Sequence, residues 1–258
     1  MSDAFAQATA WSPGQAEPRI GSDALWPWLI ALLHHDSLAS FDAYHVGVAS
    51  LASRYGGAGL RSRMARISAA DSVTRLARES SAVSGFHPVV RRGAIVVHTE
   101  NPFTRDFLPV SAERLVPATR MLFGLRRAGL HRDNAAARIA SYFILLTLHP
   151  YRDGNGRTAR LLFAADTWAA DAPALDLLGL AWLHGQRSTR FHLAAKCARA
   201  GSLDMLFALH AECAAQALQT LRATLSVLDA SMSVGDTDTT MDAAHALHAI
   251  VALHIRQD

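Results

Sequence analysis

The sequence has little lysine and little glutamate. Lys196 is the single lysine, so arginine carries nearly all of the positive charge. Arginine suits bidentate contacts with phosphate. However, the arginines are scattered among acidic residues, and the net charge is only +3. Neither zinc-finger spacing nor an aromatic stacking motif accompanies them. The composition therefore gives no support for nucleic-acid binding.

Cysteine and long apolar runs are also scarce. The two cysteines, Cys197 and Cys213, lie in sequence with helical periodicity and form no disulfide framework. The most apolar early run, residues 24–33, is too short to span a bilayer and contains Pro27. The first residues lack a basic leader with an apolar core. We therefore expect no signal peptide, no membrane association and a cytoplasmic location, although a secreted effector would look similar.

Helix-forming residues are abundant in the 258-residue chain, half of which is hydrophobic. Apolar residues recur at helical spacing, which indicates an all-α fold. We expect an N-terminal arm and helical extension over residues 1–60, a central domain over 61–230, and a linker with a last helix over 231–258. Within the central domain the predicted helices span residues 62–83, 111–129, 134–149, 157–170, 174–184, 188–199 and 203–229.

One stretch of the central domain differs from this helical pattern. Residues 94–98 are rich in β-branched side chains, and residues 100–102 have the composition of a turn. Residues 106–108 could return as a second strand. The pattern predicts a short β-hairpin in an otherwise helical chain.

The connection between two predicted helices combines several reactive residue types. Residues 149–160 read HPYRDGNGRTAR. A helix that begins near Gly156 would direct unpaired N–H groups and the positive end of its dipole into the turn, where phosphate binds readily. Gly154 and Gly156 would let an anion approach the backbone. Asn155 would cap the helix and donate to a phosphate oxygen. The sequence of this turn therefore predicts a site that binds an anion.

Charged side chains flank this predicted anion site. Arg157 and Arg160 lie one helical turn apart, so both could hold a polyphosphate. Asp153 supplies the oxygen ligand that Mg²⁺ prefers, and His149 could accept a proton from an incoming hydroxyl. An ordinary surface turn explains any one of these residues, but it does not need a base, an acid and paired arginines together. We therefore predict a site for phosphate chemistry.

The same twelve residues resemble the signature of the Fic family, H-P-F-x-(D/E)-G-N-(G/K)-R-x-x-R. Every specified position matches except Tyr151, where the family usually has Phe. The resemblance extends over about residues 74–215. It implies a helical domain in which this loop joins two central helices, with a small β-hairpin flap beside it. The flap would bind the backbone of a target protein by strand addition, and it would include Ile95, Val96, Val97 and His98.

The resemblance also implies a reaction. Fic proteins usually transfer AMP from ATP to a Ser, Thr or Tyr hydroxyl of a protein and release pyrophosphate. His149 would then deprotonate the target hydroxyl, Asp153 would hold Mg²⁺, and Arg160 would hold the far phosphates. The transferred charge would be stabilised by Gly154, Asn155, Gly156 and Arg157. Transfer of UMP, phosphocholine or phosphate stays open, as does a non-catalytic binding module with the same fold.

Many Fic proteins carry an inhibitory helix, (S/T)-x-x-x-E-(G/N), whose glutamate pairs with the second arginine of the signature. The segment from Ser80 to Gly85 resembles it, but Ser84 stands in place of the glutamate. No glutamate of the chain follows a serine or threonine by four positions. We therefore expect no internal brake, although a partner protein could inhibit the chain. A helix end capped by Gly85 is the plainer interpretation of this segment.

Other polar residues give weaker indications. His34, His35 and Asp36 lack a third ligand at a recognisable metal spacing. His245 and His248 could share one helical face, with His254 later, but a plain amphipathic helix is the favoured interpretation. Arg187, Arg190 and His192 lie where proteins of the resembled family contact the nucleotide, and Arg190 is the candidate among them.

Overall fold

The structure, a computed structural model, describes residues 59–97, 107–127, 134–170, 176–177, 179–180, 183 and 189–232. These residues belong to two compact units. The first unit contains the described residues up to 170 and residues 189–209, and the second contains those within 176–183 and 210–232. The limits expected from the sequence, 1–60, 61–230 and 231–258, stay a prediction.

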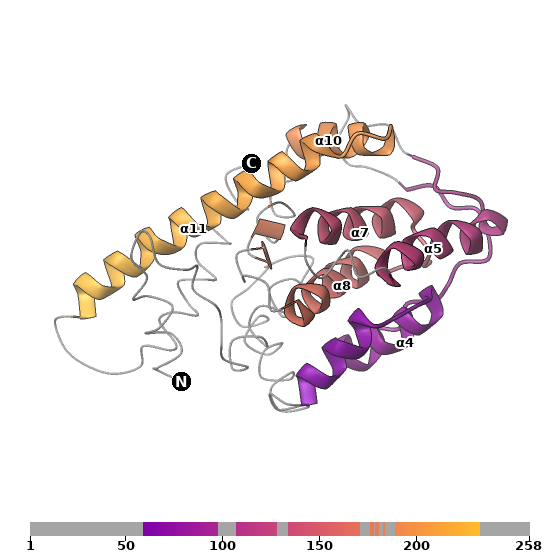
Figure 1. The fold of residues 1–258 in the computed structure, drawn as a ribbon, viewed down its shortest axis with the longest axis horizontal. Helices are drawn as coiled ribbons and strands as arrows, with labels where there is room; N and C mark the ends of the chain where they lie inside the picture. Colours follow the sequence, from indigo (N-terminus) through magenta and orange to yellow (C-terminus); the bar gives the residue numbers. More distant parts are fainter. Residues whose placement is uncertain are drawn as a thin grey trace. The chain divides into compact units, whose positions relative to one another are not determined.

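The described chain is mainly helical, as the sequence predicts (Figure 1). Residues 59–68 form a helix. None of the described helices has the length and apolar composition needed to cross a bilayer. The remaining principal helices are α4 (Val73–Ser84), α5 (Ala112–Arg127), α7 (Ala135–Leu148), α8 (Asn155–Ala169), α10 (Thr189–Arg199) and α11 (Asp204–Met232).

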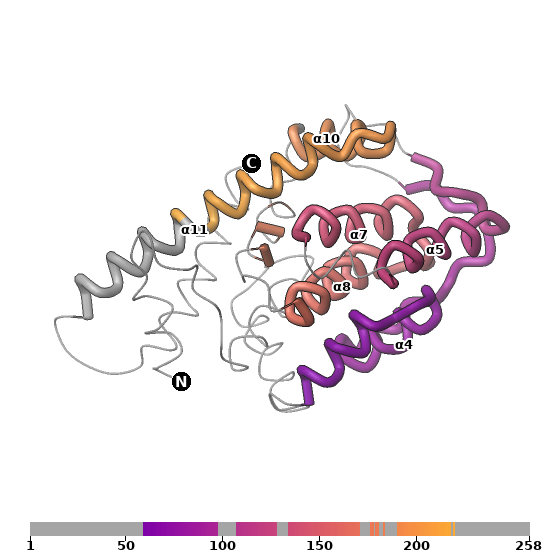
Figure 2. Tube along the Cα trace, viewed as in Figure 1, coloured from indigo at the N-terminus to yellow at the C-terminus, as the bar shows by residue number. Residues whose placement is uncertain are grey.

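Helix α8 is the most enclosed helix of the first unit. It packs against α7 and α4, and α7 also packs against α5 (Figure 2). Every residue from 158 to 168 is buried, as expected for a helix with neighbours on several sides. The surrounding core includes Leu122, Phe123, Ile139, Tyr142, Phe143 and Phe163. The loop that precedes α8 is therefore held between well-packed helices.

A buried polar cluster fixes α8 against two neighbouring segments. Arg126 of α5 pairs with the Asp166 carboxylate of α8 and donates to the Ser68 carbonyl oxygen at 2.8 Å. The Ser68 hydroxyl also donates to Asp166, at 2.8 Å. Because removing one partner of a buried ion pair is costly, these contacts favour a single rotation of α8 about its axis.

The single helix predicted over residues 62–83 is wrong, because the structure divides it. Helix 59–68 ends before Asp71, and α4 begins at Val73. Ser72 is the N-cap, with extended backbone geometry and a hydroxyl that accepts from the Arg75 N–H at 3.3 Å. Serine competes for backbone hydrogen bonds in this way, and it is therefore favoured at helix starts.

The described residues do not confirm the predicted hairpin. Val97 and Phe107 exchange two antiparallel backbone hydrogen bonds, at 3.1 and 3.2 Å. Among the residues that the structure describes, they form an isolated bridge. His98 and the predicted turn lie outside the described residues. The pairing agrees with two chain segments approaching each other, but the hairpin flap itself stays a prediction.

Candidate functional site

The loop between α7 and α8 begins at His149, where the sequence predicts the end of a helix. His149 is the C-cap of α7, with left-handed backbone angles φ 48° and ψ 58°. Its N–H donates to the Leu145 carbonyl oxygen at 3.1 Å. Among the described residues it is the one non-glycine residue with positive φ. This conformation is uncommon for a residue with a side chain, so the neighbouring structure must hold it.

The imidazole of His149 is half-buried at this helix end. Its Nδ1 lies 3.3 Å from the Leu146 carbonyl oxygen. If Nδ1 carries the proton, it donates to this carbonyl and leaves the Nε2 lone pair available as a base. Burial lowers the pKa of His149 below its ordinary value of 6.5, and the Arg91 charge lowers it further. The Leu146 carbonyl and the Asp153 carboxylate oppose this shift. A neutral imidazole is therefore favoured at neutral pH.

Tyr151, which departs from the family signature, anchors the loop. It is fully buried, and its hydroxyl donates to the Val73 carbonyl oxygen of α4 at 2.9 Å. A phenylalanine could not make this hydrogen bond. Burial also raises the pKa of the Tyr151 hydroxyl far above its ordinary value, so it stays protonated. The substitution therefore keeps the aromatic ring and adds a bond between the loop and α4.

The start of α8 differs in detail from the prediction. The helix begins at Asn155, and Gly154 is its N-cap, with no side-chain cap bond. Asn155 is therefore not the cap. Its amide Nδ2 donates to the Tyr151 carbonyl oxygen at 2.8 Å, and its Oδ1 accepts from the Tyr151 N–H at 2.9 Å. The side chain thus fastens the loop to the helix. Since Nδ2 carries two N–H groups, one bond to Tyr151 is compatible with another to a phosphate.

Gly154 has the left-handed angles φ 77° and ψ 15°. A Cβ atom at this position would lie 1.9 Å from Cε1 of Phe86. Glycine is therefore needed here for two reasons, the positive φ and the packed aromatic ring. Phe86 was missed at the level of sequence, because nothing in its neighbourhood indicates that it reaches a loop almost seventy residues away.

Asp153 and Arg157 contact each other in this structure. Arg157 Nη2 lies 3.2 Å from Asp153 Oδ2, and Asp153 Oδ1 accepts from the Gly154 N–H at 2.6 Å. The Arg157 guanidinium also lies over the Phe86 ring, 3.7 Å from its centroid. The predicted magnesium ligand and the predicted phosphate ligand are thus neighbours at the mouth of the loop.

Arg160 is 1% exposed, so it is not a solvated surface arginine. One guanidinium nitrogen lies 3.2 Å from the point where a Cβ on Gly156 would stand. The side chain therefore folds back toward the start of α8, and the glycine leaves room for it. Burial raises the pKa of Tyr142 on α7 to about 12, and the charge of Arg160 opposes this shift. The positive charge of Arg160 thus acts on Tyr142 of α7, near the start of α8.

The predicted degenerate inhibitory segment forms the end of α4. Ser80 is buried, and the Ser84 hydroxyl donates to its carbonyl oxygen at 2.9 Å. Gly85 is a left-handed C-cap with φ 69°. The segment is therefore a helix end with a glycine cap, on a helix that packs against α8. Its role as a remnant of a brake stays a prediction.

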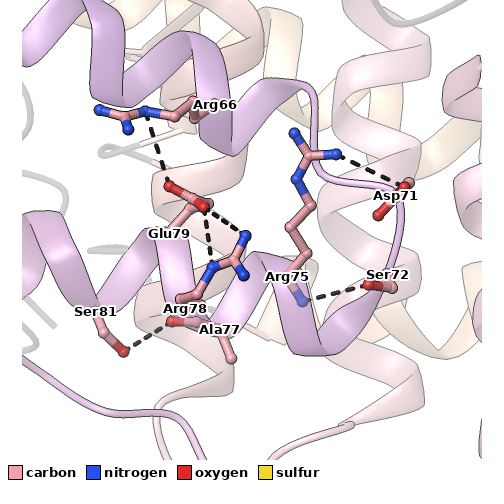
Figure 3. Close-up of polar contacts among 8 residues, drawn as sticks. All are labelled: Arg66, Asp71, Ser72, Arg75, Ala77, Arg78, Glu79 and Ser81. Carbon is pink, nitrogen blue, oxygen red and sulfur yellow. Dashed lines mark hydrogen bonds and ion pairs between the residues drawn. The ribbon is translucent and has the colours of Figure 1, made fainter.

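The glutamate nearest to this segment is directed elsewhere. Glu79 is buried, and its carboxylate lies 3.0 Å from Arg78 Nη2 and 3.9 Å from Arg66 Nε (Figure 3). Arg66 belongs to the preceding helix, so this contact joins helix 59–68 to α4. Glu79 therefore has a structural position, between Arg78 and Arg66.

The remaining predicted site residues lie at the margins of the described chain. Ile95 is half-buried and Val96 is exposed, beside the bridged Val97. Arg190 is exposed on α10. His192 follows on the same helix, with its ring 5.8 Å from that of Phe191. Arg187 lies outside the described residues.

Comparison with known families adds one finding. Residues 89–165 match the model of the Fic/DOC family, which confirms the predicted resemblance and indicates a Fic-type transferase. The match begins beside the loop, at the segment that bridges to Tyr151, and ends inside α8. It covers less than a third of the chain. No curated protein matches the sequence.

Proposed function

We propose that the Fic domain of this chain is a Mg²⁺-dependent protein adenylyltransferase. It transfers AMP from ATP to a Ser, Thr or Tyr hydroxyl of a target protein or of the chain itself. The observation that carries this proposal is the loop geometry. A half-buried imidazole ends α7, and six residues later the amide groups of α8 begin. This arrangement can place a proton acceptor and an anion site against one substrate.

His149 is the proposed general base. Its Nε2 accepts the proton of the target hydroxyl as that oxygen forms a bond to the α-phosphorus of ATP. The bond from the α-phosphorus to the oxygen that bridges to the β-phosphate breaks, and pyrophosphate leaves with the electron pair. The lowered pKa of His149 supports this role, because only the neutral imidazole can accept a proton.

The start of α8 is the proposed phosphate site. Its first N–H groups and its dipole favour an anion, and Gly154 and Gly156 keep side chains out of the way. Arg157 lies at the mouth of the loop and the buried Arg160 folds back toward the helix start. These two positions suit contacts with different phosphates of one nucleotide.

Asp153 fits a magnesium site only if the nucleotide takes part. One exposed carboxylate cannot form a protein cage for a metal, and no group of three potential ligands occurs among the described residues. Mg²⁺ in nucleotide sites commonly uses one or two carboxylates together with phosphates and water. When bound, it would neutralise charge on the α and β phosphates. Asp153 Oδ2 becomes available as Arg157 turns toward phosphate.

The end of α4 supports a transferase without an internal brake. Ser84 occupies the position of the expected glutamate, and Glu79 is engaged by Arg78 and Arg66. Inhibition would then depend on a partner protein. The protein target would bind along the predicted flap, and the reaction would take place in the cytoplasm of the cell that makes or receives the protein.

Labelled ATP tests the proposed reaction. The full chain is incubated with Mg²⁺, a cell lysate and ATP labelled at either the α or the γ phosphate. AMP transfer predicts protein label from α only. Label from γ only would mean phosphate transfer, and label from neither would favour another donor or a binding module. His149→Ala should remove the α label while nucleotide binding, measured by calorimetry, is retained. A fully active His149→Ala variant would exclude the base role.

A further inference from the structure

The catalytic loop is paired with a segment that precedes the predicted flap. Arg91 N–H donates to the Pro150 carbonyl oxygen at 2.9 Å, and Arg152 N–H donates to the Val89 carbonyl oxygen at 2.9 Å. These two bonds flank the antiparallel bridge between Val90 and Tyr151. The backbone at Arg91 is therefore fixed beside the residue that follows His149.

The side chain of Arg91 reaches the end of α7. It is 3% exposed, and its Nε donates to the His149 carbonyl oxygen at 2.8 Å. Its Nη2 lies 3.3 Å from the Leu148 carbonyl oxygen. The last carbonyl groups of a helix lack partners within the helix and favour a positive charge. The guanidinium therefore supports the left-handed backbone on which the imidazole is mounted.

The same guanidinium contacts the chain on both sides of the predicted flap, at Gly93 and at Val110, which together are called the flap base. Nη1 donates to the Gly93 carbonyl oxygen at 3.1 Å, and Nη2 donates to the Val110 carbonyl oxygen. Gly93 precedes Val97, and Val110 follows Phe107, the two residues that bridge to each other. One side chain thus meets the chain as it enters the predicted flap, as it leaves it, and at the end of α7.

We propose that Arg91 is a positioning residue that couples the base of the flap to the catalytic histidine. This inference rests on the proposed function. A guanidinium presents its five N–H groups in one rigid plane, so it fixes several acceptors relative to one another. A target strand that moves the flap base would shift the His149 carbonyl, and a flap held in place would orient the imidazole toward the hydroxyl. Lysine, with one compact ammonium group, cannot span the same four carbonyl oxygens.

Carbonyl dipoles compensate much of the buried charge. Burial lowers the pKa of Arg91, and the exposed Glu113 carboxylate opposes this shift from a distance. A buried charge needs its hydrogen bonds more than an exposed one does. Loss of the planar contacts should therefore loosen the flap base and the end of α7 together.

Hydrogen exchange of the full chain without nucleotide provides the first test. Arg91→Lys keeps the charge and removes the planar fork, and Arg92→Lys is the matched control because Arg92 is exposed. In Arg91→Lys we expect amide exchange to rise at least tenfold in residues 93–97, 107–110 and 148–152 together. Arg92→Lys should change none of these segments. Faster exchange only at the flap base, only at the end of α7, or at neither would overturn the coupling.

Enzyme kinetics separate positioning from general stability. With α-labelled ATP and labelling of the chain itself, Arg91→Lys should lower kcat more than tenfold and change the KM for ATP less than twofold. An unchanged kcat, or a parallel rise in KM, would overturn the inference. Arg91→Ala should be at least as defective, with folding checked by circular dichroism. If it does not fold, Arg91→Lys decides. A wild type that labels neither itself nor any protein of a cell lysate would refute the proposed function, and hydrogen exchange would still decide the role of Arg91.

Discussion

Two helices that pack against α8 end in a residue with left-handed backbone, but the residues differ. Helix α4 ends at Gly85, with φ 69°, and α7 ends at His149, with φ 48°. Both cap residues donate a backbone N–H to the fourth preceding carbonyl oxygen, at 2.9 and 3.1 Å. The same helix end is thus made once by the residue without a side chain and once by a residue with a large one.

The difference separates what folding requires from what chemistry requires. Glycine adopts positive φ without steric cost and is the usual residue at this position. At the end of α7 a histidine takes the same conformation, followed by Pro150, which cannot continue the helix. Arg91 holds its carbonyl oxygen from outside. Uncommon backbone conformations with side chains persist where the surroundings hold them and where the side chain has a use.

Replacing His149 with glycine should sharpen this comparison most. His149→Gly makes the end of α7 like that of α4 and removes the proposed base. We expect AMP transfer to fall by about a thousandfold, since general base catalysis contributes ~10²–10⁴-fold. The free energy of unfolding should change by less than about 1 kcal/mol, because relief of backbone strain offsets the added freedom of the unfolded chain.

Transfer assays with α-labelled ATP and urea denaturation measure these two quantities. The matched control is His149→Ala, which also lacks the imidazole but keeps a Cβ at positive φ. His149→Ala should be as inactive as His149→Gly, and its free energy of unfolding should be somewhat lower than that of His149→Gly. If His149→Gly were severely destabilised, the histidine would have a structural role, and the contrast with Gly85 would fail.

Sequence alone predicted the elements near the motif well, because their signals are local. Asn134 caps α7, with its side chain accepting from the Ala136 N–H at 2.8 Å. Pro150 marks the end of that helix, and α10 starts and ends within a residue of its expected limits. Caps and prolines act on neighbouring backbone groups, so a reader of the sequence can recognise them.

Contacts distant in sequence could not be predicted in the same way. Phe86 packs on Gly154, and Arg91 reaches carbonyl oxygens near residues 93, 110 and 149. A phenylalanine after a glycine cap and one arginine of an adjacent pair have no distinctive pattern. The orientation of Asn155 was also missed, because its partner is the backbone of Tyr151 rather than the helix start. Such contacts follow from tertiary packing, which no local propensity encodes.

A glutamate at the end of α4 should make that helix end act on the α8 site. Ser84→Glu restores the inhibitory pattern, and we expect transfer of AMP to the chain itself to fall about tenfold, the effect of losing roughly 1.4 kcal/mol. The added carboxylate would compete with phosphate for Arg160. Labelling with α-labelled ATP measures the effect.

Ser81→Glu is the control for this variant. Ser81 is also half-buried and donates its hydroxyl to a carbonyl oxygen of its own helix, that of Ala77, at 2.8 Å. Its position differs from that of the family glutamate, so labelling should remain near the wild-type level. Equal inhibition by both variants would indicate a general effect of charge. No inhibition by Ser84→Glu would refute the interpretation of this segment as a degenerate brake.

Substitution of the other cap should affect stability rather than chemistry. Gly85→Ala places a Cβ at positive φ, and we expect the free energy of unfolding to fall by about 1 kcal/mol. The Ser84 hydroxyl accepts from the Phe86 N–H at 3.2 Å, so the chain leaves this cap in a fixed direction. Thermal and urea unfolding measure the loss. Gly93→Ala is the control, because Gly93 is exposed and nothing lies within 4 Å of its added Cβ. An unchanged free energy of unfolding in Gly85→Ala would show that the cap tolerates a side chain without help from neighbours.

The pH dependence should show the smallest effect and concerns the His149 side chain directly. Its pKa is lowered below 6.5, first by burial and then by the charge of Arg91. The unfolded chain therefore binds the proton more readily. The stability that comes from the neutral imidazole is complete above pH 6.5 and is lost as pH falls toward the folded pKa.

The proton that His149 binds at low pH also removes the base. At pH 6.5 we expect the transfer rate constant to exceed half of its plateau value at high pH, whereas an ordinary histidine, half protonated at that pH, would give half of the plateau. Rate constants from pH 5 to 8 measure this, with the imidazole titrated by NMR in parallel. A midpoint at or above 6.5 would mean that the end of α7 does not disfavour the protonated imidazole, and the base role would lose its electrostatic support.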